Sequence, residues 1–275
     1  MIPDPEQVGS HVPTSFQVDQ SIPAVMLDHV SKWYGQVIGL NDVSLAIGGG
    51  VTGILGPNGA GKSSMLNCIN GIYQPQQGSI IFKNELLSKV NPNLIAKKGI
   101  SRTFQNLALF KRMSVLDNIL IGRRLHMNAN FIQVAFQTNK ARKEEIENRK
   151  KCEEIIEFLE IDDIKNTPVG KLPYGLQKKV ELGRALATEA EVLLLDEPMA
   201  GMNVEEKREM CRFILKVNDE IGTTMVLIEH DMGVVMDISD NVVVLDYGKT
   251  LADGPPSEIR ANQDVIDAYL GVAHD

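Results

Sequence analysis

Cysteine is scarce in this chain, and the few that are present are not arranged for redox or metal chemistry. Its 275 residues include three cysteines, Cys68, Cys152 and Cys211, which lie far apart and form no CxxC pair. Disulfide scaffolds and metal sites need closely or regularly spaced cysteines. The sequence therefore predicts a protein of a reducing compartment, with three buried apolar thiols.

Long apolar runs and an excess of basic residues are also missing. No apolar stretch reaches the ~20 residues that span a bilayer, so any membrane role requires a partner. The formal net charge of -8 leaves no broad basic surface for nucleic acid. The first residues lack a basic and an apolar signal region. We expect a cytoplasmic protein, with a flexible leader over residues 1–22 and a short tail over 272–275.

What the sequence does contain is a phosphate-binding loop. Residues 56–64 read GPNGAGKSS and satisfy GxxxxGK[ST], in which glycines let backbone N–H groups curl around phosphate oxygens. An apolar run before the loop predicts a strand, and helical spacing after it predicts a helix. Lys62 is placed to reach the terminal phosphates, and the Ser63 hydroxyl to ligate Mg²⁺. The sequence predicts an ATP site, completed by Asn58, Gly59, Ala60, Gly61 and Ser64.

Two later apolar runs deliver polar side chains to what we expect to be the same edge of a sheet. The first ends in Asp196 and Glu197, and the second precedes His230. Asp196 is expected to hold Mg²⁺, commonly through water, and Glu197 to orient or deprotonate the attacking water. His230 is expected to contact the terminal phosphate or that water. An acidic pair after a strand is also a common helix cap, and a lone histidine is more often structural.

The order of elements predicts an α/β fold with a helical insertion. Early strands, expected to form an antiparallel layer, cover residues 25–30, 43–47 and 79–82, whereas later buried strands cover 192–195, 224–228 and 242–245. Helices are expected between them, at 115–125, 140–160 and 173–187. The middle helix carries an apolar face and exposed pairs such as Glu147 with Lys151. We place the insertion at about 112–188.

These motifs together resemble those of ATP-binding-cassette (ABC) ATPases, and in particular the nucleotide-binding subunit of branched-chain amino acid importers. The resemblance covers residues 24–271 and rests on the phosphate loop, Gln105, the segment LPYGLQ at 172–177, the acidic pair and His230. Features nearer to the subfamily lie at 102–106, 200–203, 228–232 and 265–271. The resemblance implies a P-loop cassette over residues 23–271, with an antiparallel β subdomain, a RecA-like core and an inserted α-helical subdomain.

The resemblance also implies roles for individual residues. Gln105 is the Q-loop glutamine, expected to act in catalysis and at Mg²⁺, and His230 is the switch histidine. Tyr34 is expected to stack on adenine. Tyr174 and Gly175 belong to the signature, which in this family contacts ATP bound to a second cassette. Two cassettes, either identical or paralogous, are thus expected to pair head to tail.

Three features depart from the family pattern. One has no expected mechanistic consequence: residues 48–50 read GGG and lack the acidic residue common before the following strand. Pro173 stands where the signature usually has serine, so the hydroxyl expected on the partner's terminal phosphate is missing. Proline is tolerated in the first turn of a helix, whose positive end still faces the phosphate. Asn203 stands where many cassettes have aspartate, which weakens the case for a charged contact across the dimer.

The function that the resemblance implies is ATP hydrolysis, with ATP and Mg²⁺ as cofactors, that powers uptake of branched-chain or related amino acids. The implied partners are transmembrane permease subunits on the inner face of the cell membrane, a second cassette and, indirectly, an extracytoplasmic solute-binding protein, but no nucleic acid. Apolar Leu107, Leu109 and Phe110 suit the permease contact, or else ordinary core. A cassette for lipopolysaccharide or lipid export, and a soluble cassette outside transport, are the alternatives.

Overall fold

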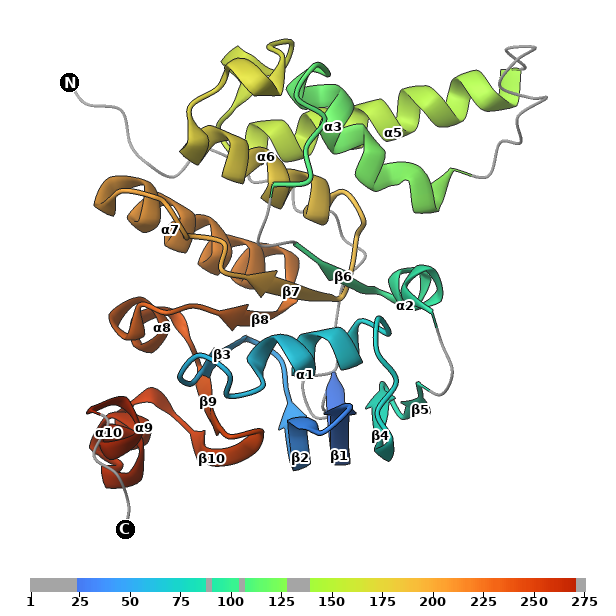
Figure 1. The fold of residues 1–275 in the computed structure, drawn as a ribbon. Helices are drawn as coiled ribbons and strands as arrows, with labels where there is room; N and C mark the ends of the chain where they lie inside the picture. The colour runs from blue at the N-terminus through green and yellow to red at the C-terminus, as the bar shows by residue number, and fades with distance from the viewer. Residues whose placement is uncertain (1–23, 88–90, 104–106, 128–138, 271–275) are drawn as a thin grey trace.

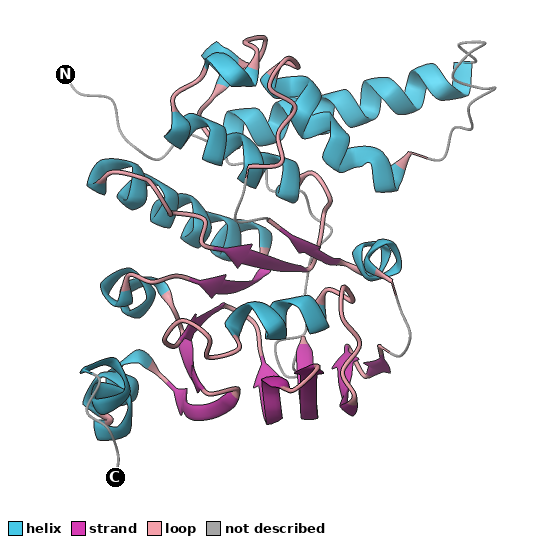
Figure 2. Ribbon diagram, in the orientation of Figure 1, coloured by secondary structure: helices cyan, strands magenta, loops and turns pink. Residues whose placement is uncertain are grey.

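The computed structural model describes residues 24–87, 91–103, 107–127 and 139–270. Two sheets occupy the lower and middle parts of the molecule, and a layer of helices lies at the top of the view in Figures 1 and 2. The predicted leader and tail lie outside the described residues. The predicted domain limits therefore stay predictions.

The smaller sheet is antiparallel and comes from the N-terminal part of the chain. Its strands run in the order β2-β1-β4-β5, and their bounds are β1 Val25–Tyr34, β2 Val37–Ile47, β4 Gln77–Phe82 and β5 Glu85–Leu86. The central strand β1 pairs with both neighbours, so that Val25 lies opposite Ile47 on one side and Phe82 on the other. The predicted antiparallel layer is confirmed.

The larger sheet is parallel except at one edge, where β10 runs antiparallel to β9. Its order is β10-β9-β3-β8-β7-β6, and its strands are β3 Val51–Leu55, β6 Ile100–Arg102, β7 Val192–Asp196, β8 Thr224–Ile228, β9 Asn241–Asp246 and β10 Lys249–Gly254. All residues of β3, β7 and β8 are buried, as expected for parallel strands covered on both faces. Their carboxyl ends meet at one edge of the sheet.

Helices flank the larger sheet, and several of them were not predicted. They are α1 Lys62–Ile69, α2 Pro92–Lys98, α7 Val204–Ile221, α8 Met232–Ile238, α9 Pro256–Ala261 and α10 Gln263–Leu270. The sequence analysis missed α7, although its four buried side chains, Met210, Phe213, Ile214 and Val217, have i, i+3, i+4, i+7 spacing. That spacing was the available signal.

A helical segment lies between β6 and β7 and forms the upper layer of Figure 1. It consists of α3 Val115–Gly122, η1 Arg123–His126, α5 Asn139–Phe158, η2 Asp162–Ile164, η3 Val169–Lys171 and α6 Tyr174–Leu186. Where one helix was predicted over 115–125, α3 ends at Gly122 and continues as a 3₁₀ turn. The predicted apolar face is confirmed, since Cys152 and Ile156 on α5 and Leu159 directly after it are fully buried.

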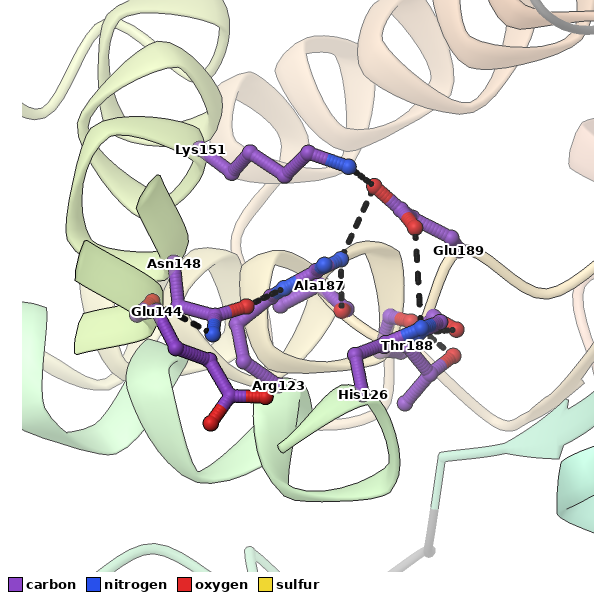
Figure 3. Close-up of polar contacts among 9 residues, drawn as sticks. Arg123, His126, Glu144, Asn148, Lys151, Ala187, Thr188 and Glu189 are labelled. Atoms are coloured by element: carbon purple, nitrogen blue, oxygen red, sulfur yellow. Dashed lines mark hydrogen bonds and ion pairs between the residues drawn. The ribbon is translucent and has the colours of Figure 1, made fainter. Parts of the chain in front are cut away.

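A buried arginine ties the helical segment together (Figure 3). Arg123 donates to the Asn148 side chain on α5 at 2.9 Å and to the Ala187 carbonyl beyond α6 at 3.0 Å, and it pairs with Glu189 at 2.9 Å. Lys151 also pairs with Glu189, which corrects the predicted surface pair of Lys151 with Glu147. Burial alone would raise the pKa of Glu189, but these two cations together lower it. The segment after α6 is thus fixed against η1 and α5.

Candidate functional site

The phosphate loop has the backbone geometry that its glycines predict. Gly56 has a φ of 148°, and a side chain there would collide with the carbonyl oxygen of Leu245 on β9. Gly61 has a φ of 105° and ends the loop directly before α1. Only glycine adopts these conformations without strain. The loop therefore runs from β3 into the amino end of α1, where backbone N–H groups and the helix dipole favour an anion.

Lys62 is buried and folded back onto the loop. Its ammonium group donates to the carbonyls of Gly56 at 2.6 Å and Pro57 at 3.0 Å. Burial lowers the pKa of Lys62, and the carboxylates of Glu197 and Asp196 partly offset that effect. The loop cation and the two predicted acidic residues therefore share one electrostatic environment, even though they are far apart in the sequence. Ser63, next to Lys62, is exposed.

Glu197 lies at the end of β7 in a strained backbone conformation. Its φ is 50°, a left-handed value that is uncommon outside glycine, and its N–H donates to the Ile228 carbonyl at the end of β8 at 2.9 Å. The side chain reaches His230, whose Nε2 lies 2.6 Å from Glu197 Oε1. The structure therefore brings the expected base and the expected switch histidine into direct contact beside Lys62.

Asp196 has a partner that the sequence analysis did not assign. Arg102, at the end of β6, lies 2.6 Å from the Asp196 carboxylate and donates to the Asn67 side chain on α1, also at 2.6 Å. Both charged side chains of the pair are 7% exposed. The sequence signal was the place of Arg102 in the segment 102–106 that resembles the subfamily, three residues before Gln105.

The residues present suit a magnesium ion that is held chiefly by a nucleotide. Mg²⁺ commonly takes one or two protein ligands, keeps several waters and binds substrate phosphates. Ser63 at the start of α1 and Asp196 at the end of β7 offer a hydroxyl and a carboxylate of this kind. Within the described residues no cluster of three or more His, Cys, Asp or Glu side chains could hold a metal unaided. Gln105, the third predicted ligand, lies outside the described residues.

Glu229 has a structural role that the sequence analysis did not assign to it. It is buried, and its carboxylate accepts the backbone N–H of Met199 at 2.7 Å and that of His230 at 3.3 Å. Burial raises the pKa of Glu229. One carboxylate thus holds both the segment that carries His230 and the loop that follows Glu197.

Tyr34 lies at the side of the phosphate loop. Its hydroxyl donates to the Ser64 hydroxyl at 3.2 Å, and its ring contacts the Tyr73 ring edge to face at 5.3 Å between centroids. The Lys32 ammonium lies 5.4 Å from the Tyr34 ring centroid. The ring is 37% exposed, which leaves one surface for a further contact.

The signature residues contact the loop that follows Glu197. A side chain on Gly175 would collide with the carboxylate of Glu206, and one on Gly201 would lie 3.2 Å from the Tyr174 ring. Asn203 caps α7 in a reciprocal capping box with Glu206. Asn203 therefore has a structural role, which aspartate at this position would also fill.

Pro173 lies one position earlier than expected. It is the N-cap of α6 rather than a residue of the first turn, and within the described part of this helix no side chain caps the amino end. Its carbonyl accepts the Gln177 N–H at 3.1 Å, which begins the helical hydrogen bonding. The amino end of α6 is therefore left to the helix dipole and the backbone N–H groups.

The three apolar residues after Gln105 do not share one environment. Leu109 packs against the main hydrophobic core, whereas Phe110 is 54% exposed and Leu107 is intermediate. The ordinary-core interpretation therefore suits Leu109, and Phe110 is the residue that offers an apolar contact. None of the helices described is long and apolar enough to cross a membrane.

The larger sheet, the glycine-lined loop and the acidic pair at its carboxyl edge define a P-loop nucleotide-binding protein of the cassette type. A family model described as ABC transporter matches residues 40–200. The chain belongs to the ABC transporter family, as its motifs predicted. A second family model, described as branched-chain amino acid ATP-binding cassette transporter, matches residues 249–275.

Similar proteins support this assignment over nearly the whole chain. A high-affinity branched-chain amino acid transport ATP-binding protein of Pseudomonas aeruginosa, BraF, is 39% identical across 92% of this chain and all of its own length. LivG of Escherichia coli, which has the same description, is 35% identical over the same shares. A solved ATP-binding cassette of an ABC transporter in its ADP conformation superimposes with a TM-score of 0.79 at 30% identity, covering 91% of this chain and 99% of its own.

Proposed function

We propose that this chain is the ATP-hydrolysing subunit of an ABC importer for branched-chain or related amino acids. Membership of the ABC ATPase family supports ATP hydrolysis in general, and the descriptions of BraF and LivG support the solute class. The observation that carries the proposal is the 2.6 Å contact of Glu197 with His230 beside the buried Lys62. No observation favours lipid export or a role outside transport.

Binding of ATP requires Lys62 to exchange its partners. Its ammonium group now bonds to two carbonyls of its own loop, and a phosphate is a stronger partner because it carries negative charge. Lys62, the loop N–H groups and the hydroxyls of Ser63 and Ser64 then hold the phosphates, and Tyr34 stacks on adenine. When bound, Mg²⁺ neutralises phosphate charge, and Ser63, Asp196 and Gln105 are the residues that would hold it.

Hydrolysis depends on the Glu197 and His230 pair. The Glu197 carboxylate accepts a proton from the attacking water, which Gln105 helps to position. His230 contacts Glu197 and, in this proposal, turns toward the terminal phosphate when ATP binds. The strained backbone at Glu197 is typical of a functional site that the surrounding structure over-determines.

The signature of one cassette completes the ATP site of another in this proposal. The amino end of α6, with Tyr174 and Gly175, supplies helix dipole and backbone N–H groups to the partner's terminal phosphate. Closure of that dimer moves permease subunits at the inner face of the membrane, and Phe110 contributes to the permease contact. The solute-binding protein acts on the opposite side.

A Glu197→Gln variant tests this proposal, with Glu220→Gln, exposed near the end of α7, as the matched control. The amide keeps the shape but accepts no proton, so turnover should fall by roughly 10²-fold or more while MgATP still binds. Gel filtration with MgATP should show a stable dimer of the Glu197→Gln chain. Turnover at the parental rate in the Glu197→Gln protein would contradict the assignment of Glu197 as the base.

A further inference from the structure

The C-terminal helix reaches the phosphate loop through one tyrosine. The backbone N–H of Gly56 donates to the hydroxyl oxygen of Tyr269 on α10 at 2.7 Å, although the two residues are 213 positions apart. The segment 265–271 stood out in the sequence as a feature of the subfamily, and none of the roles proposed above uses it.

The hydroxyl, rather than the ring, accounts for the position of Tyr269. The residue is 37% exposed and belongs to neither of the two clusters of buried apolar side chains. Gly56, by contrast, is buried, and its N–H needs a partner because an unpaired buried N–H is costly. Burial raises the pKa of Tyr269, so the hydroxyl stays neutral and the contact does not depend on pH near neutrality.

The helix that carries Tyr269 is firmly seated. Val265, one turn earlier on α10, is fully buried in the cluster that also contains Val51 and Leu55 of β3. The Asn262 side chain caps α10 by accepting the Asp264 N–H at 2.9 Å. Tyr269 therefore presents its hydroxyl from a fixed element rather than from a free tail.

Gly56 is held from two sides. Its N–H is bonded to Tyr269, and its carbonyl accepts from the Lys62 ammonium at 2.6 Å. If Lys62 turns toward the phosphates of ATP, the carbonyl loses this partner while the N–H keeps its own. The Tyr269 contact is then the one that holds the first peptide of the loop in place.

We propose that Tyr269 is a positioning residue for ATP binding, which fixes the entrance of the phosphate loop from the C-terminal helix. This inference rests on the proposed function, because it assumes that the loop binds ATP. It assigns the C-terminal segment the task of keeping the loop ordered while Lys62 changes partners.

A Tyr269→Phe variant of the full chain removes only the hydroxyl. Isothermal titration with MgATP should show roughly two- to tenfold weaker binding, the range that one net hydrogen bond gives. Amide hydrogen exchange over residues 54–61 should be faster, while exchange over 256–268 stays as in the parent. Tyr247→Phe, whose ring is 85% exposed, is the matched control and should bind as the parent does.

A Val265→Ala variant separates positioning from stability. It removes buried volume from α10 but leaves the hydroxyl, so it should lower the melting temperature with a smaller loss of MgATP affinity than Tyr269→Phe. Parental affinity and loop exchange in Tyr269→Phe would overturn the inference, and so would an equal loss of affinity in Val265→Ala. Absence of MgATP binding by the parent chain would instead refute the proposed function.

Discussion

The buried pair of Arg102 and Asp196 leads to a prediction about which cation lies beside the Asp196 carboxylate when nucleotide binds. An Arg102→Met substitution keeps an unbranched apolar stem but removes the charge, leaving the Asp196 carboxylate buried without its cation. The Asn67 side chain also loses its 2.6 Å bond. Removal of one partner from a buried pair costs about 3–5 kcal/mol, and two charge-assisted hydrogen bonds of roughly 1.5–3 kcal/mol each give a similar sum.

The consequence is measurable as a thermal shift. For a chain of this size, each kcal/mol lowers the melting temperature by about 2–4 °C, so the nucleotide-free variant should melt roughly 6–20 °C lower. We expect Mg²⁺ carried by ATP to restore positive charge beside Asp196. MgATP should therefore raise the melting temperature of the variant more than that of the parent, whereas ATP with a chelator should not.

Arg212→Met is the matched control for this prediction. Arg212 makes a two-point contact with Glu160, at 2.9 and 2.8 Å, but both side chains are about half exposed. Such an exposed pair contributes about 0–1 kcal/mol, so the control should melt within a few degrees of the parent. If Arg102→Met melts with the parent and gains no more from MgATP than the parent does, Arg102 does not stand in for the metal at Asp196.

Two further predictions concern Glu229 and Gly175. Burial raises the pKa of Glu229, so its stabilising contribution is complete below its unfolded pKa of 4.5 and is lost as pH rises through its folded pKa. Glu229→Gln keeps an acceptor for the Met199 N–H. Its free energy of unfolding, measured in urea, should therefore decline less as the pH rises from 5 to 7 than that of the parent. Parallel curves of unfolding free energy against pH for the two proteins would argue against this cause. Gly175→Asp places a charge beside Glu206 and at the face expected to meet the partner's ATP, so MgATP-dependent dimers and turnover should be lost while monomers still bind nucleotide. Gly175→Ala separates size from charge, and normal turnover in Gly175→Asp would contradict the signature assignment.

Local patterns accounted for the parts of the fold and site that lie close together in the sequence. The loop at 56–64 is one continuous motif, and its glycines have the backbone angles that the pattern requires. The buried strands β7 and β8 are short apolar runs, so the sheet edge that carries Asp196 and His230 followed from them. The helix α7 shows how a clear period can be overlooked when charged residues dominate a segment.

Contacts between distant segments could not be predicted from one sequence. Arg102 meets Asp196 across 94 positions, and Tyr269 meets Gly56 across 213. No spacing rule links such residues, because the order of strands in the sheet and the packing of α10 determine which side chains meet. Asn203 shows that the role of a single residue can also be misjudged from its type. The sequence suggested a lost charge, whereas in the structure Asn203 caps α7.

The contact between Gly175 and Glu206 makes the signature and the catalytic loop one mechanical unit. Lys179 on α6, one turn after Gly175, pairs with Glu209 on α7 at 2.7 Å, so that two contacts join the same two helices. We expect a tilt of the helical segment to move the start of α7 and, through the Asn203 cap, the loop that follows Glu197. These contacts give movement of the upper layer a physical route to the loop that follows Glu197, the residue proposed as the base.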